Sequence, residues 1–221
     1  RDCAQYRKMT EIIRVLKART NGEVMLFPTL WSPFKIASFT YCFAGSSDAA
    51  FMAHCAEDPE AVLAGVGKIA NALADWVEGY MQAGASGVYY SGQFSEPARF
   101  DQATWQKLVM PSDLEVLNRV KELGGYNILH ICGEEEHGFV SDPKRYVNYP
   151  GDLFNWDVHR TGLSLEQGQT LFRAPVLGGL DNHGALVHGT PKAVADETRD
   201  VIALMGRKGV MLGADCTVPA T

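Results

Sequence analysis

Apolar stretches of strand length alternate along this chain with segments of helical length, and that alternation limits the possible folds most strongly. One segment begins at Asp58-Pro59 and stops before Gly84, which gives a long helix with an N-cap, a proline in its first turn and a glycine after its end. Strands separated by helices pair in parallel, because a parallel connection needs a long crossover. The sequence therefore predicts an α/β fold with one parallel sheet, whose strands we expect at residues 24–30, 87–91, 126–132, 152–156, 176–180 and 210–212.

The predicted order of elements favours a (β/α)₈ TIM barrel over a dinucleotide-binding fold. No Gly-x-Gly-x-x-Gly follows the early strand. Six open strands would leave two exposed sheet edges, whereas a closed barrel of eight strands leaves none. We therefore expect residues 1–221 to form one partial barrel domain, with the first two βα units and the last helix outside this sequence.

Charge and composition exclude several classes of protein. The net charge is −6 and no basic stripe is present, which argues against a nucleic-acid partner. No apolar run approaches the ~18 residues that would suggest a membrane span. The five cysteines are an odd number with no visible signal peptide, which is typical of reduced thiols in the cytoplasm.

Three residues at expected strand ends form a candidate metal site. His130 and Cys132 are two positions apart on one strand, so their side chains point to the same face. Cys216 follows the last expected strand, and the carboxyl ends of barrel strands share one rim. A Cys₂His set with one open position is the pattern of a catalytic zinc site. On spacing alone, buried structural thiols and a hydrogen-bonded histidine remain an alternative.

Several ordered segments resemble the uroporphyrinogen decarboxylase superfamily. Ser32-Pro33-Phe34 is similar to its "APWTL" segment, and Ala83-Gly84-Ala85 to its "AGA" before a strand. Leu177 to Asp181, followed by Gly189-Thr190-Pro191, resembles its "GNLDP…GTP" block. The resemblance spans residues 24–219 in order and implies the same barrel fold.

The superfamily has two chemistries, and this sequence resembles the branch of methylcobamide:thiol (coenzyme M type) methyltransferases more closely. That branch carries His-x-Cys at one strand end and a distant cysteine as zinc ligands, as His130, Cys132 and Cys216 would be here. Phe39 stands where the decarboxylases have an active-site tyrosine. The resemblance implies zinc and a corrinoid as cofactors, with a corrinoid protein and a small methyl donor or acceptor as partners. A homodimer is left open.

Two other hypotheses for the function remain open. One is a porphyrinogen decarboxylase of tetrapyrrole biosynthesis, in which the cysteines are incidental. The other is a corrinoid-binding barrel without catalysis.

Further residues receive expected roles. Asp157 and Asp181 are expected to be catalytic, by orienting His130. Tyr90, Asn182 and His183 are expected to contact the corrinoid. One of Glu134, Glu135 and Glu136 is a candidate fourth ligand, although a solvated loop is the more common role of such a run.

Overall fold

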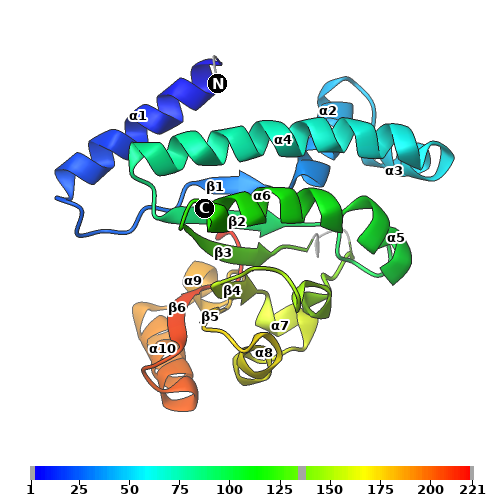
Figure 1. Cartoon of the computed structure of the whole chain (residues 1–221). Coiled ribbons are helices and arrows are strands. Elements are labelled where there is room, and N and C mark those ends of the chain that lie inside the picture. Colours follow the sequence, from blue (N-terminus) through cyan, green and yellow to red (C-terminus); the bar gives the residue numbers. More distant parts are fainter. Residues whose placement is uncertain (1–2, 134–137, 220–221) are drawn as a thin grey trace.

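A six-stranded parallel sheet forms the centre of the protein, and its strands follow one another in sequence order from β1 to β6 (Figure 1). The computed structural model describes residues 3–133 and 138–219. The strands are β1 (Thr29–Trp31), β2 (Gly87–Gly92), β3 (Tyr126–Ile131), β4 (Leu153–Trp156), β5 (Val176–Leu180) and β6 (Val210–Ala214). Consecutive parallel strands joined by helical connections are the repeating unit of a (β/α) barrel, so the predicted fold class is confirmed. Among the described residues, the β3–β4 connection carries a 3₁₀ turn in place of an α-helix.

One helix precedes the first strand, and the other helices lie in the connections between the strands. They are α1 (Ala4–Arg19), α2 (Pro33–Phe43), α3 (Asp48–Glu57), α4 (Pro59–Ala83), α5 (Gln102–Leu108), α6 (Met110–Glu122), α7 (Val158–Thr161), α8 (Leu165–Phe172), α9 (Ala185–His188) and α10 (Pro191–Met205), with a 3₁₀ turn, η2, at Pro143–Tyr146. The long helix α4 has the predicted caps, since Asp58 accepts a hydrogen bond from the Ala61 N–H and Gly84 adopts a φ of 106°. Within the described residues, no helix combines the length and apolar character that crossing a membrane requires.

The core lies between the sheet and helices α4 and α6, which pack against each other along one side of the strands (Figure 1). Val77 of α4 and Leu117 of α6 are fully buried there, as is Leu129 of β3, whereas Trp156 of β4 is buried against Phe172 of α8. Helix α1 lies across α4, and the hydroxyl of Tyr6 fills the space where a Cβ at Gly79 would stand. This packing fixes the strands that carry the candidate site.

One predicted strand is wrong in its bounds. The expected strand at residues 24–30 is reduced to Thr29–Trp31, and Val24 and Met25 are about half exposed. Pro28 has no N–H for a sheet ladder, although its carbonyl accepts from the Tyr89 N–H. The other five strands lie within two residues of the predicted bounds.

Candidate metal centre

The three predicted ligands meet at the carboxyl end of the sheet. His130 lies in β3, Cys132 directly follows that strand, and Cys216 lies two residues beyond β6. The Sγ atoms of Cys132 and Cys216 are 4.0 Å apart, and the His130 Nε2 is 3.4 Å from the Cys216 Sγ. All three ligand atoms lie within 4.8 Å of one another.

These distances fit a tetrahedral ion. Zinc bonds of ~2.3 Å to sulfur and ~2.0 Å to nitrogen place two sulfurs about 3.8 Å apart and a sulfur and a nitrogen about 3.5 Å apart. The observed separations of 4.0 and 3.4 Å differ from those values by a few tenths of an ångström. Two thiols and an imidazole are also a donor set that zinc prefers. The residues therefore fit the metal in their chemistry and in these two separations.

The His130 ring is oriented by Asn155, whose Oδ1 lies 2.6 Å from the His130 Nδ1. The Asn155 Nδ2 faces two backbone carbonyls, those of Leu177 at 2.9 Å and Ala214 at 3.3 Å, so its other end must be the acceptor. The Nδ1 of His130 therefore carries the proton, and its Nε2 lone pair points toward Cys216. This is the tautomer that a metal-binding histidine needs.

Asn155 was missed by the sequence analysis, although it is completely buried and its side chain bonds to residues of four other strands. Its Oδ1 also accepts the Tyr89 hydroxyl at 2.8 Å, and the Tyr89 ring stacks on His130 with centroids 5.7 Å apart. The sequence did offer one sign of this role, which is a lone amide in the apolar strand Leu153–Trp156. A buried amide requires hydrogen-bond partners.

Cys216 is positioned by the residue before it. The buried Asp215 carboxylate accepts the N–H of Gly179 at 2.7 Å and that of Val158 at 3.0 Å, and contacts the His159 Nδ1 at 2.7 Å. A Cβ at Gly178 would lie 3.0 Å from the Asp215 Oδ1, so the Gly178-Gly179 pair leaves room for this carboxylate. The two glycines therefore permit the close approach of Asp215.

The electrostatics of the centre favour a thiolate. The pKa of Cys216 is well below its usual range, first because of its hydrogen bond with the Cys132 thiol and then because of His130. Burial raises the pKa of Tyr89, and the two cysteines raise it further. Tyr89 therefore stays a neutral hydrogen-bond donor beside a sulfur that is ready to bind a cation.

The expected orienting role of Asp157 and Asp181 is wrong, because Asn155 holds that position on His130. Asp157 caps α7 by accepting the N–H groups of His159 and Arg160. Asp181 accepts the His183 N–H at 2.8 Å. A carboxylate oxygen of Asp157 also lies within 4.8 Å of ligand atoms of His159 and Asp215. The Asp157 and Asp215 carboxylates each accept backbone N–H groups, and these hydrogen bonds account for the cluster. Direct catalytic roles of Asp157 and Asp181 stay predictions.

Tyr90 points away from the site, so its expected contact with a corrinoid is also wrong. Its ring is fully buried and its hydroxyl donates to the Asp113 Oδ1 of α6 at 2.6 Å. Side chains alternate along a strand, and here Tyr89 faces the metal centre while Tyr90 faces the helices.

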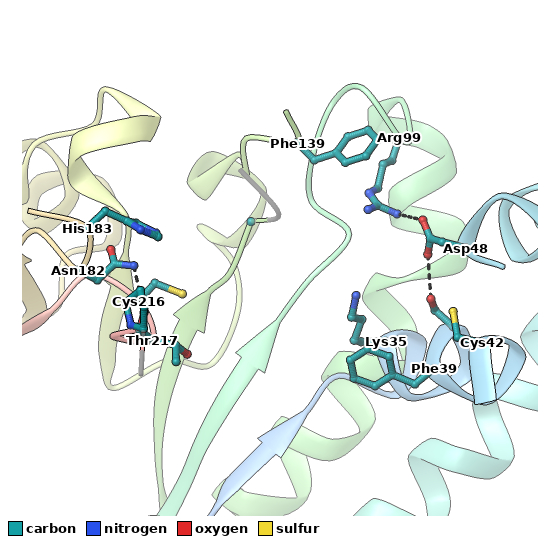
Figure 2. A pocket seen from close by; sticks show the side chains of 13 residues that line it. Lys35, Phe39, Cys42, Asp48, Arg99, Phe139, Asn182, His183, Cys216 and Thr217 are labelled. Carbon is teal, nitrogen blue, oxygen red and sulfur yellow. Dashed lines mark hydrogen bonds and ion pairs between the residues drawn. The ribbon is translucent and has the colours of Figure 1, made fainter. Parts of the chain in front are cut away.

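An outer cavity of about 690 Å³ opens beside the metal centre (Figure 2). Asn182, His183, Cys216 and Thr217 line one wall, and the other wall carries Lys35, Phe39, Cys42, Asp48, Arg99 and Phe139. Arg99 forms an ion pair with Asp48 at 2.6 Å, and the Lys35 ammonium lies 4.7 Å from the centre of the Phe39 ring. Asn182 and His183 thus line the outer cavity, and their contact with a corrinoid stays a prediction.

A second, inner cavity of about 310 Å³ is lined by all three candidate ligands together with side chains of β1 and β2. Cys216, Thr217 and Phe39 line both cavities, so the two cavities adjoin at the Cys216 side of the metal centre. The candidate fourth ligands Glu134, Glu135 and Glu136 lie outside the described residues.

Comparison with known proteins identifies a family and a fold. The sequence profile of the family described as Uroporphyrinogen decarboxylase (URO-D) matches residues 2–221. No protein with curated annotation matches the sequence. Among solved structures, a methyltransferase from Methanosarcina mazei is similar, with a TM-score of 0.75 and 16% sequence identity. The match covers 96% of this chain and 59% of that one, so this chain spans about three-fifths of that protein's length.

Proposed function

The chain belongs to the uroporphyrinogen decarboxylase family, and on that premise we propose that it is a zinc-dependent methyltransferase. It would move a methyl group between a corrinoid, carried by a partner protein, and a small thiol, methoxy or methylamine-type substrate. The observation that carries this proposal is the convergence of His130, Cys132 and Cys216 at the distances of a tetrahedral zinc site.

The chain's own residues suit that activity. Zinc, when bound, lowers the pKa of a coordinated thiol or polarises a coordinated oxygen. His130 presents its Nε2 because Asn155 holds its Nδ1, and Asp215 holds the turn that presents Cys216. Three protein ligands leave one position for a substrate atom. The inner cavity, which all three ligands line, would take the small substrate, and the adjoining larger outer cavity would give the corrinoid its approach.

The setting of the reaction is part of the proposal. All five cysteines are thiols rather than halves of disulfides, and Cys132 and Cys216 must stay reduced to bind a metal. We therefore place the protein in the cytoplasm.

Metal analysis tests the centre directly. The wild-type protein should purify with about one zinc per chain, and Cys216→Ser should lose most of it. Cys42→Ser is the matched control, because Cys42 is an exposed thiol that lines the outer cavity outside the triad. Cobalt loading should give a thiolate charge-transfer band in wild type and in Cys42→Ser that weakens in Cys216→Ser. A metal-free wild type, or an unchanged Cys216→Ser, contradicts the proposal.

The second candidate is a metal-independent decarboxylase, and the description of the family favours it. It predicts porphyrinogen decarboxylation that is unaffected by chelators and by Cys216→Ser. The methyltransferase hypothesis predicts that the protein transfers a methyl group from methylcobalamin to a thiol, and that Cys216→Ser abolishes this transfer. Tight corrinoid binding without any turnover would instead indicate a non-catalytic barrel.

A further inference from the structure

The inner cavity has an uncharged lining on the side formed by β1, β2 and the residue after β2. Its walls come from Thr29 and Trp31 of β1, from Tyr89 and Ser91 of β2, and from Gln93. Within the described residues, no Lys, Arg, Asp or Glu lines it. The outer cavity differs, because Lys35, Arg99 and Asp48 line its far wall. A charged ligand group in the inner cavity would lose its hydration without gaining an opposite charge from these walls.

Gln93 is the one amide side chain that the described residues contribute to that lining. Only 8% of the residue is exposed, and its Nε2 donates to the Ser91 Oγ at 3.3 Å. Its Oε1 has no hydrogen-bond partner within the described part of the chain, although it is buried. Leaving a buried carbonyl oxygen unpaired costs about 1–3 kcal/mol, so the amide is set to accept a hydrogen bond from a bound molecule.

The backbone around Gln93 is held in an uncommon conformation. Phe94 adopts a φ of 64°, which is unfavourable for a bulky side chain. Its ring packs edge-on against Phe34, with centroids 5.0 Å apart. The Tyr146 hydroxyl donates to the Gln93 carbonyl at 3.4 Å. Such strain is concentrated at functional sites, and here it fixes the position from which the Gln93 side chain leaves the backbone.

We infer that the inner cavity binds the small methyl donor or acceptor, and that this molecule is uncharged and donates an N–H or O–H to Gln93. The inference rests on the metal centre of the proposed function, because the reacting atom would take the open position while the remote end reaches Gln93. A cavity of about 310 Å³ is at the small end of ligand sites, which suits a compact molecule.

A series of thiols with one metal-binding head and different tails tests this. The probes are 3-mercaptopropionamide, 3-mercaptopropionate and 1-butanethiol, titrated into cobalt-loaded protein and followed by the cobalt spectrum. Wild type should bind the amide about fivefold or more tightly than either of the others, the gain expected of one buried hydrogen bond. Gln93→Leu should remove that preference. Gln82→Leu, an exposed glutamine of α4, is the matched control and should keep it.

The outcomes separate this inference from the metal centre. Cobalt binding with a preference for the anionic tail, or a preference for the amide that survives in Gln93→Leu, overturns the inference and leaves the metal centre standing. Failure of wild type to bind cobalt overturns both. If Gln93→Leu does not fold, Gln93→Glu is the replacement variant, because glutamate keeps the shape of glutamine. The Gln93→Glu protein should still accept the amide N–H, and it should bind the propionate more weakly than wild type does. Equal binding of all three probes to wild type also overturns the inference.

Discussion

The two ends of the sheet are packed very differently, and the metal centre draws on both. In the β1–β3 part, helices α4 and α6 bury residues such as Val77 and Leu117 completely. In the β5–β6 part, helix α10 has no buried residue, and β6 leaves Met211 52% exposed. His130 and Cys132 come from the first part, whereas Cys216 comes from the second.

The difference indicates that hydrogen bonds, rather than apolar packing, position the third ligand. Asp215 is bonded to Gly179, the Ala214 carbonyl accepts from Asn155, and the Thr217 carbonyl accepts from Asn182. These bonds surround Cys216 on both sides in the sequence. Metal binding would add a further tie between the two parts, so it should stabilise the β5–β6 part more than the β1–β3 part.

The largest expected effect is a contrast between two leucines. Leu117→Ala should lower the free energy of unfolding by about 2–5 kcal/mol, because it leaves a cavity in the buried face of α6. Leu204→Ala, on the exposed face of α10, should change it by less than about 0.5 kcal/mol. Urea unfolding measures both. Similar losses at the two positions would remove the contrast between the parts.

The packed part should also be sensitive to pH, through Asp113. Burial raises the pKa of Asp113 to about 7, although hydrogen bonds from Tyr90 and Tyr149 lower it. Because the pKa is higher in the folded protein than in the unfolded chain, this group's contribution is fully present below about pH 4 and is lost as the pH rises through about 7. Wild type should therefore lose stability between pH 5 and 8, by at most about 1.4 kcal/mol per pH unit.

Asp113→Asn isolates that contribution, because the amide keeps the shape of the carboxyl group and does not titrate. The variant should lose less stability than wild type between pH 5 and 8, as measured by urea unfolding at each pH. Asp200→Asn, at an exposed position of α10, is the control and should follow wild type. An unchanged pH profile in Asp113→Asn would show that the carboxyl is ionised in the folded protein across this range.

Much of this arrangement could be predicted from the sequence, and the failures have physical causes. The Asp58-Pro59 start and Gly84 stop of α4 were readable because caps are local signals. The meeting of His130, Cys132 and Cys216 followed from strand-end placement. The sequence did not show which way Tyr90 points, because a parallel sheet is buried on both faces. Tyr89 and Tyr90 are both apolar enough to lie on either face of the sheet. Asp157 and Asp181 were misassigned because their carboxylates bond to nearby backbone N–H groups, as aspartates after a strand often do.

Asn155 is the residue that joins the two parts, so its removal should weaken the metal site. Asn155→Leu would free His130 to rotate and leave the Ala214 carbonyl without this donor. We expect zinc affinity to fall about 10- to 100-fold, the usual effect of removing a residue that orients a metal-binding histidine. Competition with a chromophoric chelator measures it. Asn118→Leu, at an exposed position of α6, is the matched control, and equal affinities in the two variants would refute the role.

The smallest expected effect concerns the hydrogen bond from Asn182 to the Thr217 carbonyl, at 3.1 Å. Asn182→Ala removes this bond on the side of Cys216 that faces the outer cavity, while the Asp215 bonds remain. One net hydrogen bond is worth about 0.5–1.5 kcal/mol, so the turn should open about two- to tenfold more often. In metal-free protein, alkylation of Cys216 should therefore become faster by that factor, and alkylation of Cys132 should not, because β3 holds it independently. Equal acceleration at both cysteines would contradict this. It would mean that the two parts of the sheet loosen together, and that Asn182 positions Cys132 as much as it positions Cys216.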